Sequence, residues 1–102
     1  HTNSMFSGIF YFSVNKNQFN IMFENLYKSM YNIVPREHNI YNSTDQKILV
    51  EDKTLILFPS EVHHQILENN SSKNRYSLAF NIIPTGYYGP ENTDSRVNIK
   101  VL

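Results

Sequence analysis

The chain has 102 residues, with nine Lys and Arg against nine Asp and Glu, so its length allows one domain and its formal net charge is zero. A zero net charge argues against a nucleic-acid-binding module, which needs a basic surface for the phosphates, and the lack of Cys excludes disulfides, thiolate metal sites and a Cys nucleophile. Hydrophobic residues make up 40% of the chain, enough for a core, yet the sequence has no visible signal peptide and no apolar run near the roughly 20 residues of a membrane span.

Short β-type runs separated by polar turns dominate the sequence. Seven segments are rich in aromatic and β-branched residues or alternate apolar with polar residues, namely 6–14, 19–23, 47–50, 54–58, 63–67, 75–83 and 96–101. The break at 51–53 predicts a hairpin between the third and fourth segments, and the NNSSKN cluster at 69–74 predicts one between the fifth and sixth. Seven short strands without a long helical pattern indicate an all-β antiparallel sandwich or barrel.

Two links fit this pattern less well. The segment 24–45 has an apolar stripe at Leu26, Met30 and Ile33 that Pro35 ends, which predicts a long loop with one helical turn. Loops of this length inside small domains are often functional. The segment 84–95 contains two of the three Gly residues and is predicted to be a second irregular link.

A histidine pair opens the fifth predicted strand, and because neighbouring strand residues point to opposite faces, only one of His63 and His64 can face the interior. A six-residue hairpin loop at 69–74 would put Glu68 opposite Arg75, Ile66 opposite Ser77 and His64 opposite Ala79. In that register His64, Arg75 and Ser77 share one face. The other face carries His63 with Tyr76, Leu78 and Phe80, and a slip of one residue would exchange the two faces.

This face would combine an imidazole that can bind a metal with a guanidinium and a hydroxyl that can hold a carboxylate, which suits a small dicarboxylate chelating a metal. On the first strand, Tyr11 shares a face with Ile9 and Ser13. His1 lies just upstream, where a loop could carry it over the barrel mouth. Two histidines far apart in the sequence could then form part of a non-haem iron site.

Each of these residues alone also has an ordinary structural interpretation. A strand histidine such as His64 is more often structural than a metal ligand, an isolated Arg75 is more often a surface residue, and Tyr11 is more often part of a core. By themselves the residues indicate an all-β domain with a candidate site. Further polar residues are expected to be solvent-exposed, namely His38, Glu61 and Glu68.

The joint pattern is more specific. It consists of His1-Thr2-Asn3-Ser4, the SGIFY run at 7–11, Phe58-Pro59-Ser60 with His64, and Arg75-Tyr76-Ser77 with Phe80-Asn81. In this combination the sequence resembles the 2-oxoglutarate-Fe(II) oxygenases that recur in phages and marine bacteria. The resemblance extends over nearly the whole chain, to Ile83.

The resemblance implies a double-stranded β-helix, or jelly-roll, of the cupin-like kind. It implies that residues 1–102 are the C-terminal portion of one such domain and an incomplete fragment of it, which agrees with a chain that begins on His1 rather than Met. The implied cofactors are Fe(II) and the cosubstrate 2-oxoglutarate, and the implied reaction is hydroxylation of an unknown substrate. The implied iron ligands are His1 and His64, and the implied cosubstrate-binding residues are Tyr11, Arg75 and Ser77.

The sequence departs from the usual triad of two His and one carboxylate. If His1 is the first ligand, the residue two positions later is Asn3 rather than Asp, and if His1 is the second ligand, its partner precedes residue 1. Residues 1–102 therefore cannot show a complete triad.

Two other functions are compatible with these patterns: a non-catalytic jelly-roll that acts as a binding or virion-associated module, and a metal-dependent cupin enzyme that does not use 2-oxoglutarate. For the oxygenase we expect a cytoplasmic location in a bacterial or phage-infected host, an unidentified substrate, and no nucleic-acid or membrane partner. We also consider homo-oligomerisation, because an exposed patch formed by Phe10, Phe12, Leu78 and Phe80 would be sticky.

Overall fold

The computed structural model describes residues 1–25 and 34–101, and within these ranges the protein is all-β, with eight strands and no helix. The described residues accordingly include no helix that could cross a membrane. The strands are β1 (Phe6–Ser13), β2 (Phe19–Glu24), β3 (Asp45–Leu49), β4 (Thr54–Pro59), β5 (His64–Ile66), β6 (Tyr76–Ile82), β7 (Gly86–Tyr88) and β8 (Val97–Ile99).

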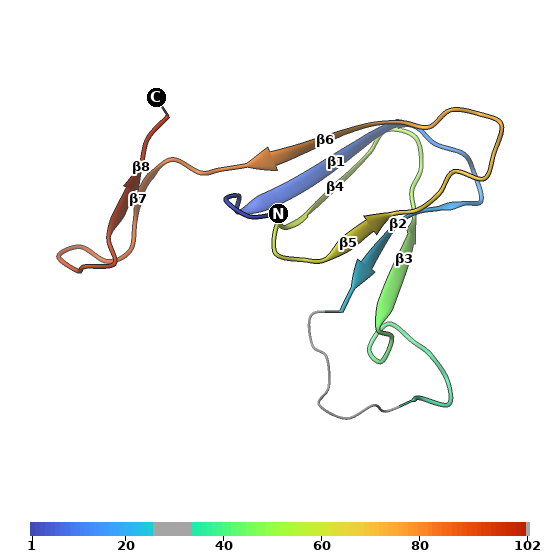
Figure 1. The fold of residues 1–102 in the computed structure, drawn as a ribbon, viewed down its shortest axis with the longest axis horizontal. Coiled ribbons are helices and arrows are strands. Elements are labelled where there is room, and N and C mark those ends of the chain that lie inside the picture. Colours follow the sequence, from blue (N-terminus) through green and yellow to red (C-terminus); the bar gives the residue numbers. More distant parts are fainter. Residues whose placement is uncertain (26–33, 102) are drawn as a thin grey trace.

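Six of the strands form two three-stranded antiparallel sheets that face each other (Figure 1). Sheet A has the order β4-β1-β6 and sheet B has the order β3-β2-β5. From β3 onward the chain changes sheet at every step, passing from β3 in sheet B to β4, β5 and β6 in turn. This alternation gives the jelly-roll-like all-β fold that the sequence predicted.

The two predicted hairpins are wrong. β3 pairs with β2 and β4 pairs with β1, so residues 51–53 connect two sheets rather than two neighbouring strands. Likewise β5 pairs with β2 and β6 pairs with β1, whereas the sequence predicted that the fifth and sixth segments pair with each other. The 69–74 loop is shaped for this crossing, since the side-chain amides of Asn15 and Asn69 both donate to the Lys73 carbonyl, at 3.0 and 2.8 Å.

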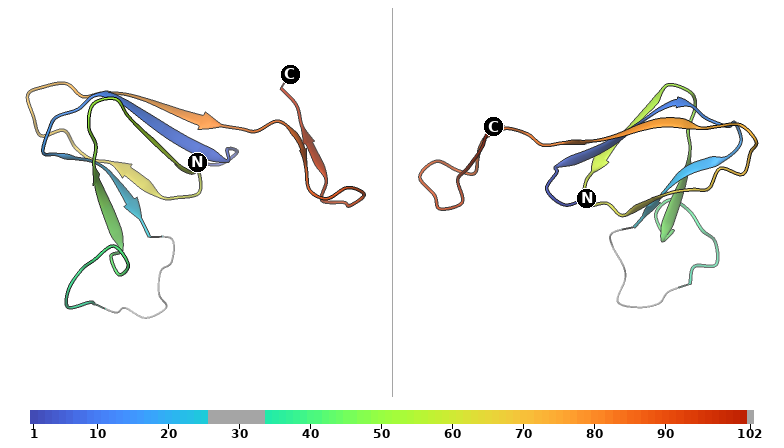
Figure 2. Two further views of the ribbon diagram at one scale, coloured as in Figure 1. Left: turned by 180° about the vertical axis from the view of Figure 1, so that it is seen from behind. Right: turned by 45° about the horizontal axis from the view of Figure 1, so that its top comes forward.

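The segment 84–95 is also not wholly irregular, because β7 lies in it and pairs with β8. Gly86 (φ 112°) and Gly89 (φ 87°) adopt backbone angles typical of glycine, and together with two prolines they gave this segment the appearance of a loop. The β7–β8 hairpin stands apart from both sheets in every view (Figure 2). The helical turn predicted at Leu26, Met30 and Ile33 lies outside the described residues.

The core lies between the inner faces of the two sheets. Its buried members come from both central strands and from the β3–β4 region: Ile9, Tyr11, Ile21, Val50 and Phe58. On β1 the inner residues are Ser7, Ile9 and Tyr11, while Phe10 and Phe12 lie on the outer face, as the alternation predicted. A bulge after Tyr11 interrupts the alternation, so Ser13 is exposed and Val14 packs against the core.

The outer face of sheet A is apolar and uncovered. Large side chains on it are about half exposed, among them Phe12 (54%), Leu57 (53%) and Leu78 (55%). The radius of gyration is 17.9 Å, against about 13 Å for a compact domain of this length. The accessible surface is 8695 Å², about 2,700 Å² more than a compact 12.0 kDa monomer would expose. The described fold therefore leaves a sheet face available for further packing.

Candidate functional site

His64 is the first residue of β5 and projects from the inner face of sheet B. It lies opposite Phe23 of β2, and its ring packs edge-on against Phe58 with 4.7 Å between the ring centroids. Its Nδ1 lies 3.0 Å from the Val62 carbonyl oxygen. An Nδ1–H that donates to this carbonyl leaves Nε2 with its lone pair, which is the protonation state in which histidine binds a metal.

His1 lies beside His64 although 62 residues separate them in the sequence. The centroids of the two imidazole rings are 5.4 Å apart. The backbone nitrogen of His1 donates to the Ser60 carbonyl oxygen at 2.6 Å, which holds the N-terminal segment against the turn that precedes β5. Two imidazoles thus converge at one end of the space between the sheets.

His63 is not part of this pair. Its side chain is 75% exposed, and its Nδ1 lies 3.7 Å from a carboxylate oxygen of Glu24. The alternation along the strand therefore places His64 inside and His63 outside, and of the two only His64 has the position from which it could share a metal with His1.

The donor chemistry of the pair fits two ligand positions of an iron site. Imidazole nitrogens are common ligands of non-haem iron. A metal-binding histidine is usually oriented by a hydrogen bond from its other ring nitrogen, often to a backbone carbonyl, and His64 has such a contact. Residues 1–25 and 34–101 contain no group of three or more His, Asp or Glu side chains placed to hold a metal. The pair could therefore supply at most two ligands of a metal site.

Arg75 spans from the start of β6 to sheet B. Its Nη2 donates to the Leu67 carbonyl oxygen at 2.9 Å, and its Nη1 donates to Oδ1 of Asn20 at 3.3 Å. Asn20 is 1% exposed because a bulge in β2 turns it inward beside Ile21. These contacts fix the guanidinium between the sheets and leave some of its five N–H donors for another acceptor.

Tyr11 is fully buried, and within the described part of the chain its hydroxyl has no hydrogen-bond partner. Burial raises the pKa of this hydroxyl above its ordinary value of 10.0, and the positive charge of Arg75 partly opposes that rise. An unpartnered buried hydroxyl costs free energy unless a ligand completes it. The Tyr11 hydroxyl could therefore donate to an acceptor placed in this space.

Ser77 lies directly opposite Tyr11 across the β1–β6 ladder, so the two side chains share the inner face of sheet A. The pairing of Ser77 with Tyr11 replaces the predicted pairing with Ile66. The inner faces nevertheless carry all four predicted residues. They come from three strands: Tyr11 from β1, His64 from β5, and Arg75 and the exposed Ser77 from the start of β6. Arg75, Tyr11 and Ser77 together offer a cation and two hydroxyls, which is a donor set for a carboxylate.

Several residues of the site were not found from the sequence. Alternation in β2 would place Asn20 outside with Met22, and no local signal reveals the bulge that turns it inward. Ser7 and Ser60 are buried with only 2% and 1% exposed, and they form hydrogen bonds to one another. Ser60 could have been noticed only through the Phe58-Pro59-Ser60 motif.

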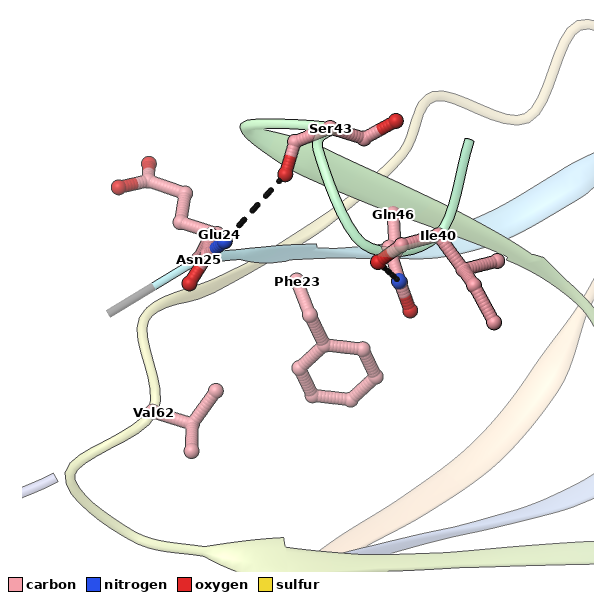
Figure 3. A pocket seen from close by; sticks show the side chains of 7 residues that line it. All are labelled: Phe23, Glu24, Asn25, Ile40, Ser43, Gln46 and Val62. Carbon is pink, nitrogen blue, oxygen red and sulfur yellow. Dashed lines mark hydrogen bonds between the residues drawn. The ribbon is translucent and has the colours of Figure 1, made fainter. Parts of the chain in front are cut away.

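A cavity of about 290 Å³ lies near the end of β2 and is lined by Phe23, Glu24, Asn25, Ile40, Ser43, Gln46 and Val62. Figure 3 shows the side chains of Phe23 and Val62 directed into it, and both residues also contact His64 through a ring or a carbonyl. On the far side, Nε2 of Gln46 donates to the Ile40 carbonyl oxygen at 2.9 Å. The cavity is thus connected to His64 through Phe23 and Val62, and neither His1 nor His64 is among its lining residues.

Comparison with known proteins gives one result. A family model described as "Putative 2OG-Fe(II) oxygenase" matches residues 1–81. The search of curated proteins and the search of solved structures each found no match. The matched range contains both histidines and all the residues that surround Tyr11 and Arg75, and it ends before the β7–β8 hairpin.

Proposed function

Because the chain belongs to the 2-oxoglutarate-Fe(II) oxygenase family, we propose that it carries the iron and cosubstrate site of a dioxygenase that hydroxylates an unidentified substrate. The observation that carries the proposal is the hydroxyl of buried Tyr11, which has no partner among the described residues and lies near the Arg75 guanidinium, in the same space between the sheets that His64 and His1 face. A metal-binding pair next to a carboxylate-binding group is the arrangement that a chelating 2-oxo dicarboxylic acid requires.

His1 and His64 would hold the iron through their imidazole nitrogens. The Val62 carbonyl fixes the orientation of the His64 ring, and Phe58 packs against the ring and limits its rotation. Phe23 and Phe58 also stack edge-on with 5.0 Å between centroids, so this side of the pair is lined by aromatic carbon rather than by water.

Arg75 would bind the far carboxylate of 2-oxoglutarate, with hydrogen bonds from Tyr11 and Ser77. Asn20 and the Leu67 carbonyl position the guanidinium before any ligand arrives, which lowers the entropy lost on binding. When bound, iron and 2-oxoglutarate would supply the chemistry that activates O₂: one oxygen atom enters the hydroxylated substrate, the other enters succinate, and CO₂ is released. The chain's own contribution is to hold these partners and to keep water away from them.

The test is an anaerobic titration of the chain with Fe(II) and 2-oxoglutarate, followed by the visible charge-transfer absorption of the iron chelate. His64→Ala should abolish the band, and Arg75→Ala should weaken 2-oxoglutarate binding by at least tenfold, because a charge-assisted pair contributes about 1.5–3 kcal/mol. His63→Ala is the matched control, since His63 adjoins His64 in the sequence but is exposed outside the site. The control should retain the band.

Two results would contradict the proposal. One is a folded chain that forms no band, and the other is a band that His64→Ala leaves unchanged. Binding of a glycan that survives both His64→Ala and Arg75→Ala, in a chain without the band, would instead favour the non-catalytic jelly-roll module. Turnover that continues after 2-oxoglutarate is removed would favour a cupin enzyme of another kind.

A further inference from the structure

Ser60 forms hydrogen bonds through its backbone and its hydroxyl, and all of their partners lie within residues 1–7. It follows β4 and is 1% exposed. Its carbonyl oxygen accepts from the His1 nitrogen at 2.6 Å, and its own backbone nitrogen donates to the Met5 carbonyl oxygen at 3.1 Å. Its hydroxyl lies 2.8 Å from the Ser4 hydroxyl and 2.9 Å from that of Ser7.

The direction of this hydroxyl chain follows from the number of hydrogens. Ser7 donates its only hydroxyl hydrogen to Oδ1 of Asn81 at 2.8 Å, so it can only accept from Ser60. Ser60 then uses its own hydrogen on Ser7, and it accepts from Ser4. The chain therefore runs from Ser4 to Ser60 to Ser7 to Asn81, and it joins the N-terminal segment to β1, to the β4–β5 turn and to β6.

His1 depends on this chain for its position. Residues 1–4 belong to no strand, and within the described structure their two hydrogen bonds both go to Ser60, one from the His1 nitrogen and one from the Ser4 hydroxyl. Ser60 in turn lies four residues before His64, on the turn that leads into β5. One buried residue thus fixes the segment that carries one imidazole to the turn that precedes the other, through its backbone carbonyl and its hydroxyl.

We propose that the Ser4–Ser60–Ser7–Asn81 chain is a positioning network that sets His1 at metal-sharing distance from His64, with Ser60 as its central residue. This inference rests on the proposed function, because it assigns the network to the imidazole pair of that site. The network touches neither metal nor substrate. It acts by restricting the freedom of the His1 segment, so its loss lowers metal affinity while the two sheets stay folded.

The experiment measures Co(II) affinity of the N-acetylated chain by visible absorption, since acetylation removes the competing terminal amine and keeps the N–H that donates to Ser60. Ser4→Ala removes one donor from a half-buried position and should weaken Co(II) binding about tenfold, the lower end of what is found when groups supporting metal ligands are lost. Ser60→Ala should weaken it more, and Ser4→Thr, which keeps a hydroxyl, should restore it. Ser13→Ala, an exposed serine at the end of β1, is the control and should bind as the parent chain does.

In a His1→Ala background there is no imidazole left to position, so adding Ser4→Ala should not weaken Co(II) binding further. If Ser4 had only a structural role, Ser4→Ala would weaken Co(II) binding in that background too. Far-UV circular dichroism checks that each variant is folded. If Ser60→Ala unfolds the chain, the Co(II) affinity of Ser4→Ala alone tests the proposal. Equal Co(II) affinity of parent and Ser4→Ala would overturn the positioning network and leave the proposed function standing. A folded parent that binds no Co(II) would overturn both.

Discussion

Replacing Tyr11 with Phe should have opposite effects on stability and on cosubstrate binding. In the free protein the Tyr11 hydroxyl is buried without a partner in the described structure, and a buried polar group in that state costs about 1–3 kcal/mol. Tyr11→Phe removes this cost and keeps the ring in the core. The free energy of unfolding should therefore stay equal or rise, by up to about 1 kcal/mol once the small void left by the oxygen is counted.

In the complex the same hydroxyl should donate to a carboxylate oxygen of 2-oxoglutarate. A hydrogen bond to a charged acceptor contributes about 1.5–3 kcal/mol, so its loss should weaken binding by roughly 10- to 100-fold. Arg75, Ser77 and the iron would still hold the ligand, which keeps the loss within that range. The variant would then be at least as stable as the parent and a clearly poorer binder.

Urea unfolding without ligand gives the first quantity, and titration of 2-oxoglutarate with Fe(II) under anaerobic conditions gives the second. Tyr76→Phe is the matched control, because Tyr76 is exposed on β6 and accepts a hydrogen bond from Asn74 at 3.3 Å. It should change neither quantity by much. If Tyr11→Phe instead lowered stability by more than about 1 kcal/mol and left 2-oxoglutarate affinity unchanged, the hydroxyl would be a structural group and the reasoning would be refuted.

Three further outcomes follow from the packing. Because burial raises the pKa of Tyr11 above 10.0, the folded state keeps this proton to higher pH than the unfolded state. This contribution to the free energy of unfolding is complete below about pH 10 and is lost as the pH rises through the pKa that Tyr11 has in the folded state. In urea unfolding measured across the alkaline range, Tyr11→Phe should show a smaller loss of stability with rising pH. Gly8→Ala should lower the free energy of unfolding by about 1–3 kcal/mol, because a Cβ there would lie 2.3 Å from Cζ of Phe80 and 2.8 Å from Cδ2 of Leu57; an unchanged urea midpoint would show that both side chains move aside freely. The chain should self-associate through the outer face of sheet A. Leu78→Lys puts a charge on a 55% exposed position of that face and should reduce the association seen by sedimentation velocity. A parent chain that sediments as a monomer at all concentrations would contradict this.

The sequence by itself determined the class of the fold and the family. Apolar and polar residues alternate with a period of two along β1, which is a local property of the backbone and predicted its inner and outer residues correctly up to Tyr11. The same rule allowed only one of His63 and His64 to face the interior. The family was predicted from motifs and confirmed by the match over residues 1–81.

Strand pairing was decided only in three dimensions. The sequence favoured pairing β5 with β6 because they are neighbours along the chain, yet each has its hydrogen-bonding partner in a different sheet. Pairing depends on which edge of a central strand is free and on which apolar faces must meet, and neither is encoded in a segment of six residues. The crossing loop at 69–74 is as polar as a hairpin loop would be.

The surroundings of the candidate site were likewise decided by tertiary structure. A bulge turned Asn20 inward toward Arg75, and a chain of hydroxyls centred on Ser60 fastened the His1 segment beside His64. Both features depend on contacts between residues at least 53 positions apart, which a local pattern cannot reveal. The sequence named residues with the right chemistry, and folding supplied the distances between them, because side-chain type is local whereas hydrogen-bond and ring contacts are made by segments that meet only after the two sheets have packed.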